Sequence, residues 1–375
     1  MAIAFCIVMG IFTGSFFYIG RRAYQVINFR FGNINVAIYT VLYLAIALSF
    51  FLGRLPLPEL PKKAISAIGS IWMGLFVYLL LLFFLADLVV AAGKIAKIAT
   101  QESLPKIQYS TRLWAILLAC LTTCFGLYNA TQVRFVSYEI HLKNPLSKEL
   151  KIAFIADLHL GDTQSENRLE KVTKLVNEAG PDLVAIVGDI FTDDYYRIKD
   201  AGKAETLIAG LDSTYGTFAC LGNHDAGKTL AEMMDFLLRS NVRLLNDEIA
   251  IIEGVISIIG RLDSSPIGGF GELSRSESIQ ALAGSPNGLP VIVMDHNPAN
   301  ISQYAQGVDL VLAGHTHRGQ IFPGSMFTSR MFTVDYGYYQ ENSSSPHIVV
   351  TSGAGTWMMP IRLGTFNEVV LITLH

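Results

Sequence analysis

Hydrophobic and polar positions follow two different patterns along the chain, and the change comes near residue 130. Before it, four stretches of 20 to 23 residues carry no charged side chain: 1–20, 31–53, 64–86 and 113–133. A helix needs about 20 apolar residues to cross a hydrocarbon core of roughly 30 Å. The pattern therefore predicts an all-α four-span transmembrane domain over residues 1–133, followed by a linker or first strand over 134–150.

Two other interpretations of these stretches fit less well. A cleavable signal peptide would begin with basic residues, but Arg21 and Arg22 come after the first stretch. Core helices of a soluble protein have no need of 20 consecutive uncharged residues four times over. Membrane spans account for all four stretches.

Charge divides at the same point in the chain. Residues 1–130 hold 10 Lys and Arg against 3 Asp and Glu, whereas residues 131–375 hold 18 against 28. The acidic part lacks the basic face that a phosphate backbone requires, which disfavours nucleic acid as a partner. Seven basic residues flank the first and third connections between spans, and six lie on the other side. By the positive-inside rule, this bias predicts that the C-terminal part is extracytoplasmic.

After residue 150, short apolar runs alternate with amphipathic ones. Buried strands are predicted over residues 151–157, 182–189, 215–222, 290–296 and 308–314. Helical periodicity covers residues 166–179 and 228–240, a hairpin is predicted over 249–260, and late strands over 348–352 and 368–374. The pattern is typical of a layered α/β domain over residues 151–375.

Each of the five predicted strands ends in polar residues that can bind a metal. Strand ends in an α/β sheet converge on one edge, where ligands bind. Any one of these residues could be a turn former or a helix cap, but five segments that deliver them in order favour a shared site. His, carboxylate and amide donors without thiolate suit Mn, Fe(II) or Zn, and their number predicts two divalent metal ions that share a carboxylate. The candidates are Asp157, His159, Asp189, Asn223, His224, Asp225, His296, His315 and His317.

The order of these motifs resembles the calcineurin-like metallophosphoesterases. That family has D-x-H, G-D, G-N-H-D/E, a strand-end His and G-H-x-H in sequence, and the match covers roughly residues 151–320. Residues 315–320 (HTHRGQ) and 352–364 (SGAGTWMMPIRLG) are similar to the bacterial membrane-attached branch of the family. The resemblance implies a four-layer αββα sandwich that hydrolyses phosphate esters, in a multi-pass protein of the bacterial cell membrane.

The resemblance also implies a role for each site residue. The metal ligands would fall into two groups that share a bridging Asp189: Asp157, His159 and His317 in one, and Asn223, His296 and His315 in the other. His224 would be an acid near the site, oriented by Asp225. Arg318, where many relatives have Gly, would bind a substrate phosphate.

Two alternatives of other functional classes stay open. Residues 222–229 read GNHDAGKT, which fits the P-loop pattern G-x-x-x-x-G-K-[ST] and would make the chain a nucleotidase. That interpretation gives the His residues of the D-x-H and G-H-x-H motifs no task. The other alternative is a non-catalytic membrane sensor built on a degenerate phosphoesterase, but every expected ligand position is filled.

The predicted substrates are phosphomono-, phosphodi- or pyrophosphoesters. Membrane spans favour a lipid-linked substrate at the bilayer, and some members of the resembling family hydrolyse UDP-2,3-diacylglucosamine. Residues 266–270 (PIGGF), the apolar tip of a Gly/Ser/Pro-rich insertion, are a candidate for lipid contact.

Overall fold

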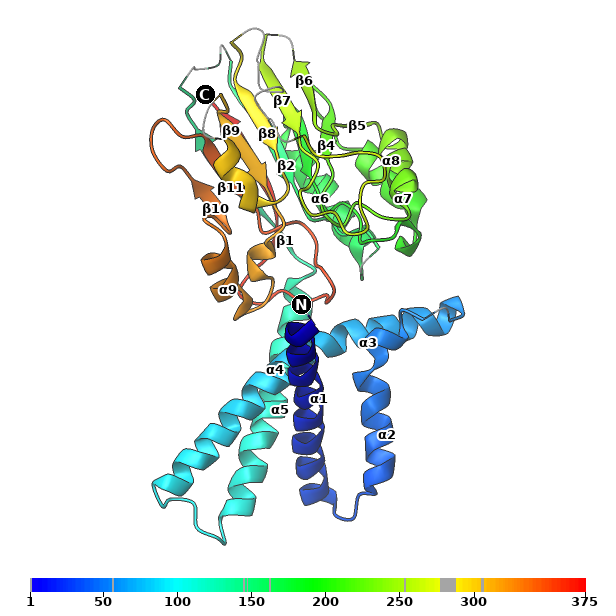
Figure 1. Cartoon of the computed structure of the whole chain (residues 1–375), viewed down its shortest axis with the longest axis vertical. Helices are drawn as coiled ribbons and strands as arrows, with labels where there is room; N and C mark the ends of the chain where they lie inside the picture. The colour runs from blue at the N-terminus through cyan, green and yellow to red at the C-terminus, as the bar shows by residue number, and fades with distance from the viewer. Residues whose placement is uncertain are drawn as a thin grey trace. The chain divides into compact units, whose positions relative to one another are not determined.

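The structure, a computed structural model, divides the chain into two units (Figure 1). One contains Met1–Leu127 with Met359–Ile361, and the other contains Tyr128–Met358 with Arg362–His375. The structure describes residues 2–55, 57–143, 146, 148–161, 163–252, 254–276, 288–304 and 307–375.

The first unit is helical. Its elements are α1 (Ala2–Phe31), α2 (Val36–Ala47), α3 (Ser49–Leu52), α4 (Glu59–Ile95) and α5 (Leu104–Asn129). Among the described residues, Pro61–Ile95 and Leu104–Asn129 are helices long and apolar enough to cross a membrane.

The predicted span over residues 31–53 differs from the observed structure. It is divided at Leu48 into α2 and the short α3. The 12 residues of α2 reach roughly 18 Å, which is shorter than a hydrocarbon core of about 30 Å. Apolar composition therefore located the helical unit, but it did not reveal this break in the backbone.

Asp87 holds three helices of this unit together. Its carboxylate pairs with Arg22 of α1 at 2.6 Å and with Arg112 of α5 at 3.1 Å. It also accepts a hydrogen bond from the Tyr18 hydroxyl, and the Gln25 side chain accepts one from each arginine. Asp87, the residue directly after the third apolar stretch, thus serves as the shared counter-charge of two guanidinium groups.

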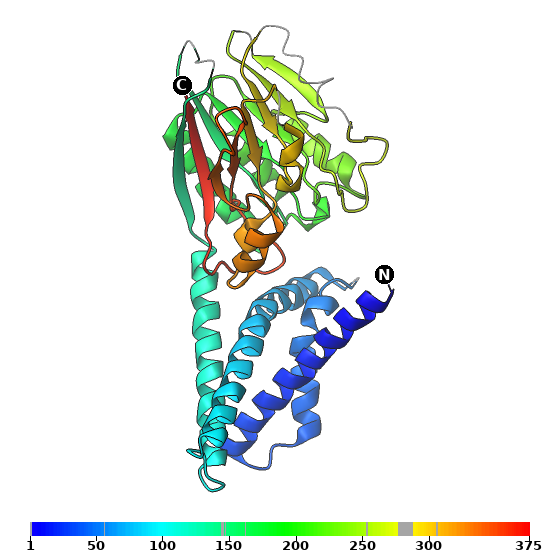
Figure 2. The same ribbon diagram turned by 60° about the vertical axis from the view of Figure 1, so that its left-hand side comes forward.

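The second unit is built on two mixed β-sheets (Figure 2). Within the described residues, each sheet has six strands, in the orders β1-β12-β2-β3-β4-β5 and β10-β11-β9-β8-β7-β6. The strands are β1 (Val133–Ile140), β2 (Leu150–Ile155), β3 (Leu183–Val187), β4 (Thr217–Cys220), β5 (Val242–Leu244), β6 (Glu248–Ile252), β7 (Ile256–Gly260), β8 (Val291–Met294), β9 (Leu310–Ala313), β10 (Gly337–Tyr339), β11 (His347–Val350) and β12 (Asn367–Leu374). All five strands predicted to end in the site are present.

Alternating side chains of these strands fill separate cores on the two faces of each sheet. In β2, Ile152 and Phe154 face the core between the sheets, whereas Ala153 and Ile155 face the helices on the outer side. Because both faces are covered, the inner strands read as continuous apolar runs rather than as alternating ones. Each such buried aliphatic or aromatic side chain contributes roughly 1.5–3 kcal/mol.

Helices α6 (Ser165–Ala179), α7 (Ala201–Ala209) and α8 (Leu230–Arg239) cover the outer face of the first sheet. Leu169, Val172 and Val176 lie on one face of α6 and are buried against the first sheet, as the periodicity predicts. On the outer face of the second sheet, the apolar cluster of described residues includes Tyr304 of the 3-10 helix η2 (Pro298–Tyr304). The fourth layer of the sandwich is therefore made, in the described residues, by a 3-10 helix and irregular segments.

Parallel pairing of the inner strands brings their carboxyl ends to the same edge of each sheet. Strands β2, β3, β4 and β5 pair in parallel, with α6, α7 and α8 as the crossovers between them. Strands β7, β8 and β9 pair in parallel in the other sheet. The segments after β2, β3, β4, β8 and β9 can therefore meet at one edge of the sandwich.

Replacing Asp87 by Ala should destabilise the helical unit. The change leaves Arg22 and Arg112 side by side without their counter-charge, which should lower the free energy of unfolding by about 2 to 4 kcal/mol. Thermal unfolding of the full chain in detergent measures this as a midpoint several degrees lower. Glu102→Ala, at an exposed position between α4 and α5, is the control and should leave the midpoint unchanged. Equal midpoints for the two variants would contradict a structural role for the Asp87 network.

Candidate metal centre

The structure brings every predicted metal ligand to one edge of the sandwich. Each follows the end of an inner strand, and all are buried except His315, which is half-buried. By strand, they are Asp157 and His159 after β2, Asp189 after β3, Asn223 after β4, His296 after β8, and His315 and His317 after β9.

One group of donors consists of Asp157, His159 and His317. Their ligand atoms lie within 4.8 Å of one another. The Nε2 atoms of His159 and His317 are 3.1 Å apart, and His317 Nε2 lies 3.3 Å from Asp157 Oδ1. Three donor atoms from two sheets thus converge on a space of the size that one cation occupies.

A second group consists of Asp189, His296 and His315. Their ligand atoms also lie within 4.8 Å of one another. Asn223 joins this group, because its Oδ1 atom lies 2.9 Å from His315 Nδ1. Asp189 faces both groups: its Oδ2 atom is 3.0 Å from His296 Nε2 and 3.8 Å from His159 Nε2. This is the position that a bridging carboxylate would take.

His296 tests whether the residues fit a metal. Its Nδ1 atom lies 2.9 Å from the Val187 carbonyl, which can accept a hydrogen bond from Nδ1–H and leave Nε2 with its lone pair. The Nε2 atom is fully buried and makes no hydrogen bond of acceptable geometry, although it lies close to the Asp189 carboxylate. With Nε2 deprotonated, the ring and the carboxylate are two acceptors that face each other in a buried site, and a cation bound between them would satisfy both. Nitrogen and oxygen donors without thiolate suit a divalent ion of hard or borderline character.

Most of these imidazoles are neutral at neutral pH, which is the form that binds a metal ion. Burial lowers the pKa of His159 to about 3 and that of His315 to about 4, so both rings are neutral at neutral pH. Burial also lowers the pKa of His317 well below its usual value. His296 is the exception: burial favours its neutral form, but Asp189 outweighs burial and raises the pKa of the ring. A metal that binds His296 therefore displaces a proton from it.

The pKa values of the two carboxylates, Asp157 and Asp189, are shifted in opposite directions. Burial raises the pKa of Asp157 to about 7. Burial also opposes ionisation of Asp189, but the neighbouring His296 and His159 outweigh it and hold the pKa of Asp189 below its usual range. Asp189 is thus the charged member of the pair and the stronger candidate for a shared ligand.

Strained backbone positions the ligands. Asp157, His159, Asp189, His315 and His317 all have φ between 47° and 69°. Each residue in this left-handed region costs about 1–3 kcal/mol unless its surroundings compensate, and such residues cluster at functional sites. Close packing fixes these turns: a Cβ on Gly222 would lie 2.3 Å from Asp189 Oδ1. Only glycine lets the turn after β4 approach the carboxylate so closely.

The carboxylate that contacts the His224 ring is not the predicted one. His224 Nδ1 lies 2.5 Å from Asp193 Oδ1. Asp225 instead accepts hydrogen bonds from the backbone N–H groups of Phe191 and Gly222, which ties the turns after β3 and β4 together. Asp193 therefore takes the orienting role predicted for Asp225. Burial disfavours a charge on His224, but the hydrogen bond to Asp193 outweighs it and raises the pKa of the ring.

Asp193 left a weak signal in the sequence. It lies four residues beyond Asp189 in the same strand-end segment, but its distance from His224 depends on how two segments fold together. Its φ of 54° places it in the same left-handed region as the ligands.

Two arginines differ in how they relate to the site. Arg318, the predicted phosphate ligand, lies with its guanidinium carbon 4.3 Å from the centre of the Tyr336 ring. Arg362, which lies in residues 352–364 but has no predicted role, is fully buried and donates hydrogen bonds to the carbonyls of His317, Ser352 and Gly355. Burial lowers the pKa of Arg362 to about 10, so it stays charged at neutral pH. Arg362 holds the His317 backbone in place.

The P-loop pattern does not form a phosphate-binding loop around Lys228. Its first residues, Asn223 and His224, turn into the metal site, while Lys228 is exposed. The Thr229 hydroxyl accepts a hydrogen bond from the Tyr195 backbone N–H. The pattern is therefore explained by the G-N-H-D turn and the entry to α8.

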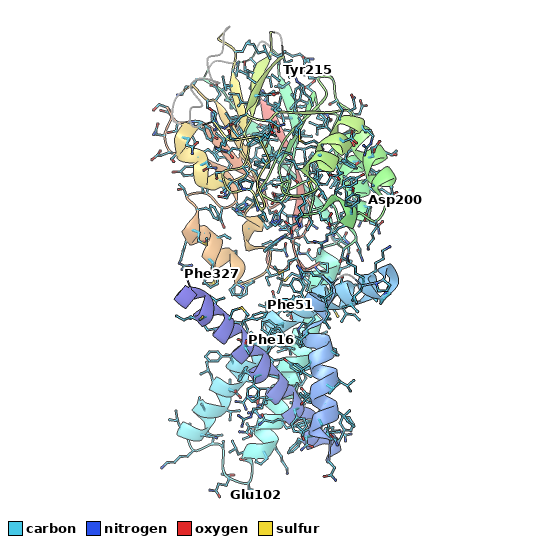
Figure 3. All side chains as sticks on the ribbon, turned by 45° about the vertical axis from the view of Figure 1, so that its right-hand side comes forward. Phe16, Phe51, Glu102, Asp200, Tyr215 and Phe327 are labelled. Carbon is cyan, nitrogen blue, oxygen red and sulfur yellow. The ribbon has the colours of Figure 1, made fainter. Side chains whose placement is uncertain are left out.

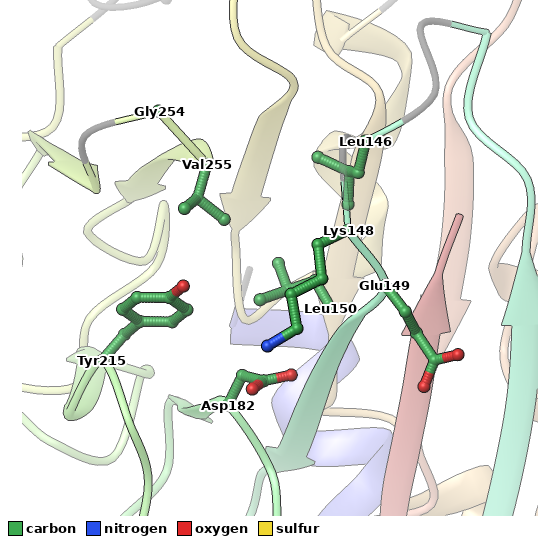
Figure 4. Close-up of a pocket in the computed structure, with 8 residues that line it drawn as sticks. All are labelled: Leu146, Lys148, Glu149, Leu150, Asp182, Tyr215, Gly254 and Val255. Atoms are coloured by element: carbon green, nitrogen blue, oxygen red, sulfur yellow. The ribbon is translucent and has the colours of Figure 1, made fainter.

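A small pocket at the other end of the strands is separate from this site (Figure 4). It lies where β2 and β3 begin, whereas the metal ligands follow their carboxyl ends. Its volume of about 30 Å³ has room for about one water molecule. Its lining residues are Leu146, Lys148, Glu149, Leu150, Asp182, Tyr215, Gly254 and Val255.

Comparison with known proteins agrees with this geometry. Residues 150–319 match the family described as calcineurin-like phosphoesterase. An uncharacterized metallophosphoesterase of Aquifex aeolicus is 29% identical, over 68% of this chain and 97% of its own length. An uncharacterized metallophosphoesterase of Bacillus subtilis is 30% identical, over 60% of this chain and 78% of its own length. A transmembrane protein with metallophosphoesterase domain from Danio rerio is 26% identical, over 90% of this chain and 80% of its own length. The chain thus belongs to the calcineurin-like phosphoesterases and is a metal-dependent hydrolase of phosphate esters.

Proposed function

We propose that this chain is a membrane-anchored phosphoesterase with a dinuclear metal centre. The observation that carries the proposal is the arrangement of two donor groups around Asp189, with His224 beside them. We propose Asp157, His159, Asp189 and His317 as ligands of one divalent cation, and Asp189, Asn223, His296 and His315 as ligands of the other. When bound, two such cations polarise a phosphoryl group and activate water for in-line attack.

Two residues of the chain, His224 and Asp193, are placed to supply a proton to the leaving group. His224 Nδ1 faces Asp193, and the His224 backbone N–H donates to Asp189 Oδ1 at 2.9 Å. These two contacts hold the imidazole next to the ligand groups without using it as a ligand. We assign His224 the role of proton donor to the leaving oxygen, and Asp193 the role of raising its pKa so that the proton is available near neutral pH.

Membrane attachment is supported by two observations. Pro61–Ile95 and Leu104–Asn129 have the length and composition of membrane spans, and relatives from Danio rerio and Bos taurus are named transmembrane proteins. We propose a multi-pass anchor with the phosphoesterase unit outside the cytoplasm. The proposed substrate is a phosphomono-, phosphodi- or pyrophosphoester presented at the bilayer surface, with Arg318 as a candidate contact for its phosphate. A non-catalytic sensor has no such support, since each ligand position is occupied by a side chain able to bind.

Asp189→Asn should abolish hydrolysis while the protein stays folded. Asn adopts the left-handed backbone conformation about as readily as Asp, so the turn is kept while the bridging charge is lost. The rate should fall by more than the roughly 10- to 100-fold that changes outside the direct ligands cost. Ester hydrolysis and elemental analysis measure the effect, and the wild type should hold up to two metals per chain. Asp194→Asn is the matched control, because Asn can still accept the hydrogen bond from Tyr196 N–H. Full wild-type activity in excess chelator would contradict the proposed centre.

His224→Asn should separate proton donation from metal binding. The variant should keep both metals and lose about 10²- to 10⁴-fold in rate on alkyl esters, whose leaving oxygen needs a proton. It should lose much less on p-nitrophenyl esters, which leave as stable anions. Steady-state rates on the two ester classes, with metal content measured in parallel, test this. An equal loss on both esters, or loss of a metal, would assign His224 a different role.

Asp193→Asn should move the alkaline limb of the pH–rate profile to lower pH. His224 must be protonated to donate, so the rate on alkyl esters falls as pH rises through its pKa. Asp193 raises that pKa, and its removal therefore lowers it. The measurement is kcat against pH on an alkyl ester, with Asp194→Asn as the control that keeps the wild-type limb. A limb unchanged in Asp193→Asn would show that Asp193 does not act through His224.

A further inference from the structure

Helix α9 (Gly324–Met331) turns its large apolar side chains away from the protein. Met326, Phe327 and Met331 are 47%, 65% and 74% exposed, and no residue of the helix is buried. In Figure 3, Phe327 and Tyr215 lie at opposite ends of the phosphoesterase unit. Single exposed apolar residues are common, but three on one short helix form a surface that a partner can cover.

These side chains share one face. At 100° per residue, Met326, Phe327, Arg330 and Met331 fall within an arc of about 140°. The Thr328 hydroxyl donates a hydrogen bond to the Asp335 carboxylate, which fixes the helix to the rest of the unit. Arg330 lies inside the apolar arc and is exposed. Residues 320–334 contain no Asp or Glu, and Asp335 is bound to Thr328, which lies outside this arc, so Arg330 gives the apolar face a positive charge.

Hydrogen bonds join the base of α9 to the end of α5. The side chain of Asn129, the last residue of α5, donates to the carbonyls of Arg362 and Thr365. The Thr365 hydroxyl donates in turn to the Gln320 carbonyl, four residues before α9. In addition, the Phe322 backbone N–H donates to the Leu363 carbonyl. The apolar face therefore belongs to the end of the phosphoesterase unit at which the chain arrives from α5 (Figure 2).

If α5 spans the membrane as proposed, chain connectivity keeps this end of the phosphoesterase unit close to the membrane surface. Helix α5 is one of the candidate spans, and only residues 130–132 separate its last residue from β1. An extended chain covers at most about 3.6 Å per residue, so β1 begins within roughly 14 Å of the helix end. A second basic residue, Arg134, is the second residue of β1 at this end. A basic side chain among exposed apolar ones, with a second basic residue at the same end of the unit, matches an anionic phospholipid surface.

We infer that the face formed by Met326, Phe327, Arg330 and Met331 rests in the headgroup region of a bilayer that contains anionic phospholipid. The tip at residues 266–270, predicted to contact lipid, is a weaker candidate, because Phe270 is buried in the core and Gly269 O accepts a hydrogen bond from Gly227 N–H. We therefore assign the lipid contact to α9 rather than to residues 266–270.

This surface is close to the metal centre along the chain. The ligands His315 and His317 precede α9 by fewer than ten residues. The Trp357 ring lies 5.5 Å from the His224 ring, and the Trp357 backbone exchanges two hydrogen bonds with the Gln320 side chain. If the proposed function holds, contact through α9 keeps the segment that carries His315 and His317 near the bilayer surface, which favours phosphoesters carried by lipids or lying against them.

Site-specific fluorescence in a bilayer tests the inference without depending on activity. The full chain, with Cys6, Cys120 and Cys124 replaced by Ser and the buried Cys220 kept, carries Phe327→Cys labelled with an environment-sensitive dye. Reconstitution uses nanodiscs of phosphatidylcholine and phosphatidylglycerol that contain nitroxide-labelled lipid. Leu238→Cys on α8, 74% exposed in the native chain, is the matched control. We expect blue-shifted emission and nitroxide quenching at position 327 and neither at position 238.

Two results would overturn the inference. Equal, water-like emission at both positions would show that α9 is solvated. Blue-shifted emission at position 327 without quenching by nitroxide lipid would show that protein, such as a second copy of the chain, covers the face.

Activity gives a second, separate readout. Phe327→Asp removes the apolar contact without touching the metal ligands, so hydrolysis of a soluble p-nitrophenyl ester should stay at the wild-type rate. Hydrolysis of a phospholipid-linked phosphoester in vesicles of the same two lipids should fall roughly 10-fold or more. Equal losses on both substrates would argue against a role confined to the membrane. Lack of hydrolysis by the wild type would contradict the proposed function and leave the fluorescence result to decide the surface.

Discussion

The buried carboxylate of Asp189 is the group on which the proposed metal centre depends. It lies between His296 of one sheet and His159 of the other, and its charge is stabilised by both. A charge in such a place needs partners at fixed distances, which neither sheet can supply alone. The alignment of the two sheets, the close approach of Gly222 and the strained turns at the ligands all serve to keep these distances.

Sequence patterns predicted the parts of the site that depend on local order. A buried strand followed by a polar turn is visible in the sequence, so Asp157, Asp189 and His315 could be found from where each strand ends. Asp193 and Arg362 could not be placed in this way. Their roles depend on contacts with His224 and His317, which are far away in the chain, and no spacing rule encodes such a contact.

The helical unit shows the same division between composition and geometry. Apolar composition identified the region but not the break at Leu48, because Leu, Ser and Phe around it have no strong breaking tendency. Asp87 directly follows an uncharged stretch in the sequence, yet its two arginine partners lie 65 and 25 residues away in the chain. The surface of α9 likewise escaped prediction, since eight residues are too few to display a clear periodicity.

The three residues between α5 and β1 have a consequence for how such an enzyme would meet its substrate. If α5 spans a membrane as proposed, a link this short gives the catalytic unit almost no freedom to search the surrounding solution. Encounters with a substrate in the same bilayer would then be governed by lateral diffusion in two dimensions. Turnover would follow the number of substrate molecules per unit area of membrane, and diluting the membranes in buffer would leave it unchanged.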